Sequence, residues 1–190
     1  IIYDKKHGDY VLHWSSSHAD NQFGDKGIYY SRTKDFQEFT KPQVLYRREG
    51  SPVIDSAIYE EDGKYYLFVK CERNPSRILL LVSDEITGTY ESVPGFAESM
   101  EAIEEGKYEA ATAVRLEDGR WCLFLDFYGA SGSGQGYVPF VADSLAEGKF
   151  VRSDEAFSFP YGFKHGTILT ITPEEYERIA AHDWSDKGWG

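Results

Sequence analysis

The chain has 190 residues, with 20 Lys and Arg against 32 Asp and Glu, a formal net charge of −12 and an aromatic content of 16%. This length suits one domain with a substantial core. The excess negative charge would repel a phosphate backbone or an anionic membrane, so we expect neither nucleic acid nor a membrane as a partner. A neutral glycan meets no such repulsion.

Few features of the sequence constrain where the protein is located. No stretch is apolar enough to span a bilayer, and no signal peptide stands out. The chain starts at Ile1 inside a strand-like segment. We therefore expect further residues before it in the parent protein, and a cytoplasmic location only by default. The two cysteines, Cys71 and Cys122, do not occupy equivalent places in the repeats described next. We expect both to be free, buried thiols.

The pattern of a strand, an acidic turn with glycine and an aromatic strand occurs three times. Its turn glycines are Gly8, Gly63 and Gly119, spaced by 55 and 56 residues. A repeat of this size made of short strands is typical of the blades of a β-propeller. One such sheet cannot bury both of its faces alone, so the blades must stack around an axis.

The repeats divide the chain into residues 1–50, 51–106 and 107–155, followed by a tail. We predict these strands in the first repeat: 9–15, 27–31 and 43–46. The second repeat is predicted to hold strands at 56–59, 64–70, 77–83 and 88–93, followed by an acidic helix or loop at 100–106. The third is predicted to hold strands at 111–116, 120–126, 136–142 and 148–151. Residues 129–136 are rich in Gly and Ser; no Lys-Ser/Thr follows and a strand comes next, so we expect a rim loop rather than a phosphate cradle.

The tail, residues 156–190, is predicted to hold one more strand at 166–171 and then a helix. Thr172 suits the N-cap, Pro173 the first helical position and Glu175 the closing position of a capping box, so the helix should end near residue 180 or 181. Three repeats and one strand are fewer than the four blades that closure needs. The predicted fold is therefore an all-β propeller of four-stranded antiparallel blades, one domain that is incomplete at its N-terminus.

Two carboxylates stand near the start of the innermost predicted strands, where neighbouring blades converge on the channel. They are Asp55 and Glu109. Glycoside hydrolysis needs a carboxylic acid to protonate the leaving oxygen and a second carboxylate nearby, and crowding of like charges raises the pKa of one member of such a pair. Acidic residues at strand starts are also common as solvated turn caps, and 32 acidic residues make chance pairs frequent.

Three segments of the chain resemble glycoside hydrolase family 43. Pro-Val-Ile-Asp-Ser-Ala-Ile at 52–58 resembles its second catalytic segment, Glu-Ala-Ala at 109–111 with the strand after it resembles its general-acid segment, and Lys-His-Gly-Thr at 164–167 is similar to its terminal strand. The resemblance implies a five-bladed propeller and inverting hydrolysis of arabinose- or xylose-containing glycans.

The resemblance also implies roles for individual residues. Glu109 would be the general acid and Asp55 the carboxylate that modulates and orients it. His165 would lie near the channel axis, where the family often holds a calcium ion or ordered waters, so that His165 could reach a metal indirectly through water. No other cofactor is implied.

Two departures from the family pattern affect this assignment. Ala110 and Ala111 stand where Gly-Pro is common after the acid. The family's general base is an Asp in the first blade, which we expect to lie upstream of this chain. Asp4 lies beside a hairpin turn and Asp20 in a polar loop, so neither is assigned that role.

Aromatic residues at strand ends are candidates for stacking on sugar rings. Trp14 and Tyr128 are the two near the expected mouth of the channel, and packing between blades is the competing explanation for both. His13 and His18 lack the spacing of a zinc site, and His13, inside a strand, is expected to be packed or hydrogen-bonded.

Three functions remain open from the sequence. The first is a glycosidase acting on an oligosaccharide or polysaccharide, and the second is a glycan-binding propeller that lacks the general base. The third is a purely structural propeller, which the presence of both carboxylates disfavours. An open propeller would also expose apolar blade faces, through which copies of the chain could associate.

Overall fold

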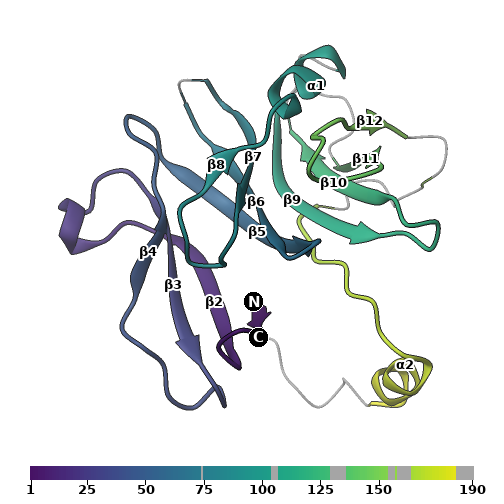
Figure 1. The fold of residues 1–190 in the computed structure, drawn as a ribbon, viewed down its shortest axis with the longest axis horizontal. Coiled ribbons are helices and arrows are strands. Elements are labelled where there is room, and N and C mark those ends of the chain that lie inside the picture. Colours follow the sequence, from purple (N-terminus) through teal and green to yellow (C-terminus); the bar gives the residue numbers. More distant parts are fainter. Residues whose placement is uncertain (74, 104–106, 129–135, 154–156, 158–163, 183–190) are drawn as a thin grey trace.

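The computed structural model describes residues 1–73, 75–103, 107–128, 136–153, 157 and 164–182. These residues contain three four-stranded antiparallel sheets, each built from consecutive strands (Figure 1). We call the sheets blades 1, 2 and 3. Their arrangement confirms the predicted class, an all-β fold of propeller-type blades. The Gly-rich loop at 129–135 lies outside the described residues.

The blades follow the predicted repeats closely. Blade 1 consists of β1 (Ile2–Asp4), β2 (Asp9–Ser16), β3 (Gly27–Thr33) and β4 (Gln43–Tyr46). Blade 2 consists of β5 (Val53–Glu61), β6 (Lys64–Cys71), β7 (Arg77–Ser83) and β8 (Glu91–Ser92). Blade 3 consists of β9 (Tyr108–Arg115), β10 (Trp121–Phe127), β11 (Gly136–Ala142) and β12 (Val151–Arg152). A short 3₁₀ helix, Ala19–Asn21, follows β2, and β1 is the strand expected before the turn at Gly8.

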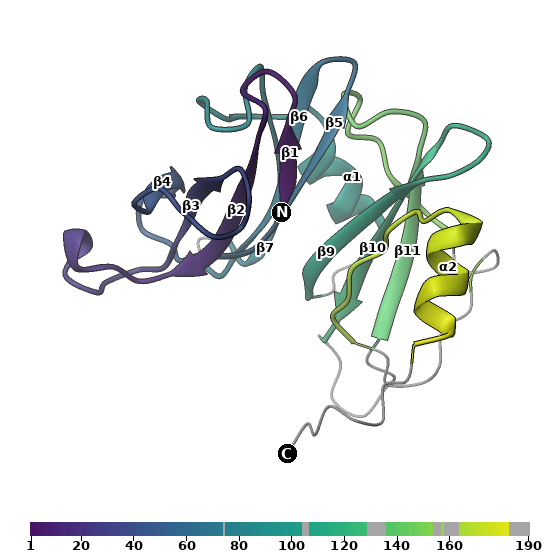
Figure 2. The same cartoon turned by 90° about the horizontal axis from the view of Figure 1, so that it is seen from below.

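Blade 2 lies between the other two (Figures 1 and 2), and buried side chains pack on both of its faces. Side chains of β6 alternate between the faces of the sheet, as in any strand. Phe68 packs into a cluster shared with blade 3, whereas Leu67 and Val69 pack into a cluster shared with blade 1. Full burial of a side chain of this size stabilises the fold by about 1.5–3 kcal/mol. The two clusters therefore hold the three blades together.

The helix α1 (Phe96–Ile103) connects blade 2 to blade 3 and begins before the region 100–106 where a helix or loop was expected. Phe96 is almost completely buried and contacts the rings of Phe68 and Phe150 edge-on, at 5.8 and 5.7 Å between centroids. The packing of Phe96 accounts for the earlier start of the helix. The prediction missed that start because it rested on the acidic composition of residues 100–106, which lie after Phe96.

The predicted strand at 166–171 is wrong. Residues 164–172, which we call the C-terminal segment, are assigned to no strand. Side chains, rather than a neighbouring strand, hold its backbone: Gly166 N–H donates to the hydroxyl of Tyr137, which in turn donates to Gly166 O at 2.9 Å. Ile168 N–H lies 3.4 Å from Thr112 Oγ1.

The helix α2 (Pro173–Ala180) follows the C-terminal segment and confirms its predicted cap. Thr172 Oγ1 accepts from Glu175 N–H, and the Glu175 carboxylate accepts from Thr172 N–H at 2.8 Å. No residue of α2 is buried, and Figure 1 shows the helix set apart from the blades. The capping box therefore contributes more to this helix than tertiary packing does.

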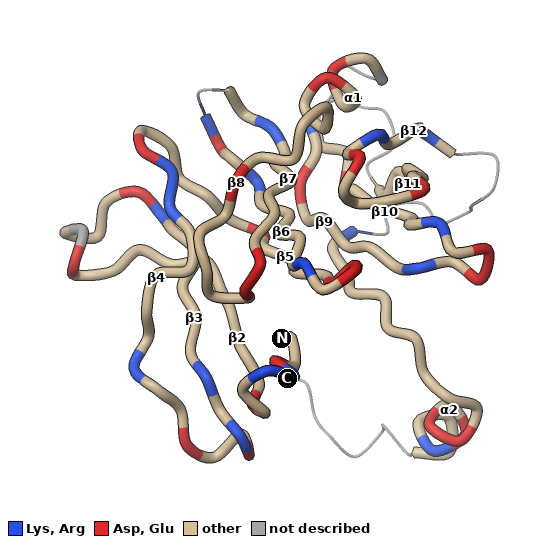
Figure 3. Tube along the Cα trace, viewed as in Figure 1, with Lys and Arg blue, Asp and Glu red and all other residues tan. Residues whose placement is uncertain are grey.

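Acidic residues are scattered along the loops and turns of all three blades (Figure 3). Both cysteines are free and buried, as predicted, and burial raises the pKa of Cys122 to about 12. No helix among the described residues is long and apolar enough to cross a membrane.

Candidate active site

A β-bulge at the start of β5 directs Asp55. Ile54 pairs with Lys70 and Ala57 with Phe68, so Asp55 and Ser56 together oppose a single residue of β6. Asp55 has φ of +53°, a left-handed conformation that short polar side chains tolerate better than most. Its N–H donates to Ser15 Oγ of blade 1 at 3.1 Å. The bulge therefore attaches Asp55 to the boundary between blades 1 and 2.

The same kind of bulge follows Glu109 at the start of β9. Glu109 pairs with Asp126 and Thr112 with Phe124, so two alanines intervene, and the first of them, Ala110, has φ of +51°. Ala110 N–H donates to Asp55 Oδ2 at 3.2 Å. The two bulges are thus hydrogen-bonded to each other across the boundary between blades 2 and 3.

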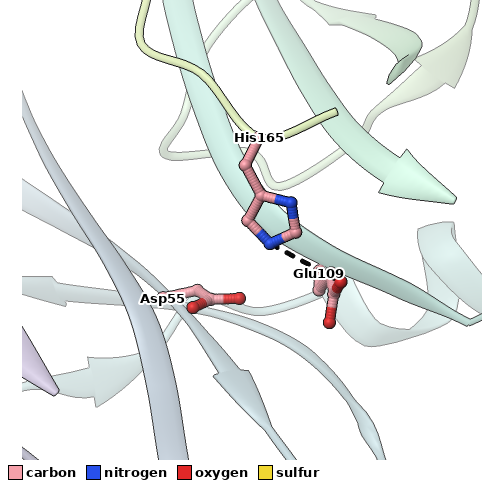
Figure 4. Close-up of side chains that lie close together, drawn as sticks. All are labelled: Asp55, Glu109 and His165. Carbon is pink, nitrogen blue, oxygen red and sulfur yellow. Dashed lines mark ion pairs between the residues drawn. The ribbon is translucent and has the colours of Figure 1, made fainter. Parts of the chain in front are cut away.

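His165, in the C-terminal segment, completes a cluster with the two carboxylates (Figure 4). One side-chain donor atom of each of Asp55, Glu109 and His165 lies within 4.8 Å of the others. His165 Nε2 is 3.5 Å from Glu109 Oε1, and the Glu109 side chain is 23% exposed, so solvent and a ligand can reach it. Residues 55, 109 and 165, far apart in sequence, therefore meet at one end of the inner strands.

A buried lysine supports the strand that carries Glu109. Lys70 occupies the place on β6 that Asp126 occupies on β10, opposite the residue before each bulge. It is only 2% exposed, and its ammonium donates to Tyr108 O at 2.9 Å and to Tyr128 Oη at 2.8 Å. Lys70 therefore fixes the backbone next to the acid from the neighbouring blade.

A cavity of about 470 Å³ extends along the inner strands from this cluster. Its lining includes Asp55, Ser56, Thr112, His165 and His13. Glu109 is not part of the lining but is the chain neighbour of Ala110, which is. The volume lies within the range of ligand-binding pockets. The cavity offers hydroxyl, imidazole and carboxylate groups to a ligand.

His13 joins blade 1 to this cavity. Its Nδ1 lies 2.7 Å from Ser56 Oγ, which confirms the expected hydrogen-bonded histidine. Burial lowers the pKa of His13 to about 4, so the ring is neutral near pH 7. Its place in the cavity was not predicted. The mixed pattern of β2, in which polar and aromatic residues follow one another, gave no clear sign of which residues face inward.

Of the predicted residues, the structure brings Asp55, Glu109 and His165 together and leaves the two aromatic candidates apart. Trp14 follows His13 on β2 and therefore points to the opposite face of the sheet, and it does not line the cavity. Tyr128 does not line the cavity either; its ring lies 5.0 Å from the ammonium of Lys70. The sequence analysis assigned no role to Lys70 or Asp126, although a charge next to the buried end of a largely apolar strand was a usable signal for both.

The comparison with protein families agrees with this geometry. A family model described as a probable glycosyl hydrolase domain, related to glycoside hydrolase family 43, matches residues 1–177. The chain belongs to this family. No curated protein matches the chain.

Solved structures of glycoside hydrolases share the fold of this family member. A thermostable family-43 glycoside hydrolase is 15% identical over 80% of this chain and 52% of its own, with a TM-score of 0.53. A native arabinanase from Bacillus subtilis is 15% identical over 79% of this chain and 53% of its own, with a TM-score of 0.55. A family 117 glycoside hydrolase from Zobellia galactanivorans is 14% identical over 77% of this chain and 52% of its own, with a TM-score of 0.54. The chain spans about half the length of these three proteins.

The residues of the cluster do not form a ready calcium site. Calcium takes six to eight oxygen ligands. Among the described residues the cluster offers two carboxylates and one imidazole. The calcium ion that the family resemblance implies therefore stays a prediction, and no step proposed below involves a metal.

Proposed function

We propose that the protein containing this chain hydrolyses glycosidic bonds in arabinose- or xylose-containing glycans, with inversion at the anomeric carbon. Glu109 is the general acid in this proposal, and Asp55 modulates and orients it. The observation that carries the proposal is the meeting of Asp55, Glu109 and His165 at one end of the cavity. Membership of a family of probable glycosyl hydrolase domains supports it.

The spacing of the carboxylates supports these separate roles. The acid and base of an inverting glycosidase stand about 6.5–9.5 Å apart, which leaves room for the attacking water. Oxygens of Asp55 and Glu109 lie within 4.8 Å of each other, too close for that arrangement. Asp55 is therefore the modulator in this proposal and not the base, which the family resemblance assigns to a different Asp.

Replacing Glu109 tests the proposal. In the full-length protein, Glu109→Gln should lower kcat by about 10²- to 10⁴-fold, because proton donation to the leaving oxygen is lost. Aryl glycosides whose leaving groups need no protonation should lose much less. Affinity for the sugar, measured by calorimetry, should change little, and NMR of the first anomer released by the wild type should show inversion.

Glu117→Gln is the matched control, because Glu117 is an exposed glutamate in the turn after β9. It should leave turnover unchanged. If Glu109→Gln hydrolyses good and poor leaving groups as fast as the wild type, Glu109 is not the acid.

A glycan-binding protein without turnover is the second candidate. It is favoured by one observation: among the described residues that line the cavity, Asp55 is the only carboxylate. This alternative predicts sugar binding by the full-length protein with no release of product from any glycoside tested. Turnover by the wild type would exclude it.

A further inference from the structure

One buried carboxylate in blade 3 has no role in the proposal above. Asp126 lies on β10 within an otherwise apolar strand and is completely buried. Removing a carboxylate from water is costly unless opposite charges or hydrogen bonds compensate it. Neither oxygen of Asp126 has a hydrogen bond of good geometry to any residue that the structure describes.

The groups that compensate Asp126 come from the C-terminal segment. His165 Nδ1 lies 2.9 Å from Asp126 Oδ2, and Lys164 Nζ lies 3.9 Å from the same oxygen. The closer of the two is the imidazole that also faces Glu109. His165 is itself about half exposed, so Asp126 supplies the buried side of its environment.

The register of β9 and β10 places two carboxylates beside the imidazole of His165. Glu109 and Asp126 are directly opposite each other, so their side chains emerge on the same face. Like charges in that position destabilise a sheet. The imidazole of His165 contacts both carboxylates, with Nδ1 toward Asp126 and Nε2 toward Glu109. Figure 4 shows the ring with Nε2 directed at Glu109.

The backbone of the C-terminal segment cannot fix this ring by itself, because the segment belongs to no strand. Its hydrogen bonds to the blades are made by the side chains of Tyr137 and Thr112 and involve residues after His165. Tyr137 on β11 is the cross-strand neighbour of Asp126. Two adjacent strands thus contact two adjacent residues of the segment. Asp126 on β10 contacts the imidazole of His165, and Tyr137 on β11 is hydrogen-bonded to the backbone of Gly166.

We propose that Asp126 is a positioning residue whose carboxylate, 2.9 Å from His165 Nδ1, favours a proton on that nitrogen and thereby directs Nε2 toward Glu109 and the cavity. Asp126 touches neither substrate nor the reacting atoms. Its effect on turnover rests on the proposed function, but its effect on the imidazole does not. Neutral imidazole in water favours the tautomer with the proton on Nε2, so a proton held on Nδ1 is a specific consequence of Asp126.

Nitrogen-15 NMR of the imidazole rings tests this directly. Five histidines are present, and His165→Gln identifies the signals of His165 by their loss. In spectra recorded at a pH where the ring carries a single proton, we expect the wild-type His165 to hold that proton on Nδ1. Asp126→Asn should move the proton to Nε2, or to a mixture of tautomers. It should also lower kcat by about 10- to 100-fold with little change in KM, as for other partners that orient a functional histidine.

Tyr137→Phe is the matched control. It removes the hydroxyl that holds Gly166 but leaves Asp126 and His165 in place, so the Nδ1–H tautomer should persist and kcat should stay near the wild-type value. If Tyr137→Phe moved the tautomer and kcat as far as Asp126→Asn, Asp126 would merely anchor the segment.

The wild-type spectrum alone can overturn the proposal, even if Asp126→Asn does not fold, because a singly protonated ring with its proton on Nε2 contradicts it. A wild-type protein without glycosidase activity would refute the proposed function but leave the tautomer result standing.

Discussion

Two carboxylates on the same strand, β5, show how this fold uses acidic residues in different ways. Glu61 is the last residue of β5, at the end away from Asp55. It is buried, and both of its carboxylate oxygens accept hydrogen bonds from blade 3. It accepts from Trp121 Nε1 at 2.6 Å, from Ser144 Oγ at 2.9 Å and from Leu145 N–H at 2.8 Å. Asp55 is at the channel end and partly exposed. Of the described residues, only Ala110 donates a hydrogen bond to its carboxylate.

The difference separates a structural carboxylate from a chemical one. An oxygen already filled with donors has no lone pair left for a sugar hydroxyl or a proton. Glu61 therefore contributes to cohesion between blades 2 and 3, whereas Asp55 keeps acceptor capacity free beside Glu109. Both reach across the same blade boundary, so burial and hydrogen bonding distinguish them better than their position in the repeat does.

Removing Glu61 should have the largest effect on stability. Glu61→Ala leaves the buried donors of Trp121 and Leu145 without an acceptor, and breaking a buried charged network of this kind costs about 3–5 kcal/mol. Urea denaturation of the wild type and the variant measures the change. Glu60→Ala, on the exposed face of the same strand, should cost less than about 1 kcal/mol. Similar midpoints for Glu61→Ala and the wild type would mean that the network contributes little.

Replacing Asp55 should have a smaller effect on stability and a larger one on chemistry. Asp55→Ala places alanine at a φ of +53° and removes the acceptor for Ala110 N–H, at a cost of about 1–3 kcal/mol. Asp55→Asn tolerates that φ and keeps an amide oxygen, so it should stay within about 1 kcal/mol of the wild type. Turnover should fall in both variants, because both lose the charge next to Glu109.

Comparing the two Asp55 variants separates geometry from charge. Denaturation midpoints measure how much the backbone conformation and hydrogen bond of Asp55 contribute to stability. The kcat of the full-length protein measures how much its charge contributes to turnover. Equal destabilisation by Asn and Ala would show that the negative charge of Asp55, rather than its bulge conformation and hydrogen bond, stabilises the native state.

Much of the architecture could be predicted from the sequence because turns and apolar strands are local signals. Gly63 and Gly119 have φ of +77° and +88°, as the acidic turns with glycine require. The capping box at Thr172 is also local. The predicted strand at 166–171 failed because its partners are the side chains of Tyr137 and Thr112, which no pattern within the segment reveals.

The site was predictable only in part, for a related reason. The family resemblance pointed to Asp55, Glu109 and His165, which the fold brings together. Lys70 and Asp126 owe their roles to register, because each lies opposite the residue that precedes a bulge on the neighbouring strand. A bulge shifts which residues face each other and is not visible as a break in hydrophobic alternation. Trp14 was considered for the site because it lies at a strand end, yet the alternation of β2 directs it away.

The smallest expected effect concerns the bulge beside Glu109. Unlike the variants above, the one proposed here should gain stability rather than lose it. Ala110 has φ of +51°, where an alanine costs about 1–2 kcal/mol relative to glycine. Ala110→Gly removes that strain, and the greater freedom of glycine in the unfolded chain offsets about 0.5–1 kcal/mol of the gain. The variant should be more stable than the wild type by about 0.5–1 kcal/mol in urea denaturation, since its N–H can still donate to Asp55. Ala113→Gly, in the regular part of the same strand, lacks this compensation and should be destabilising. If both variants lost stability equally, the bulge would store no strain, and the direction of Glu109 would depend on Lys70 and His165 instead.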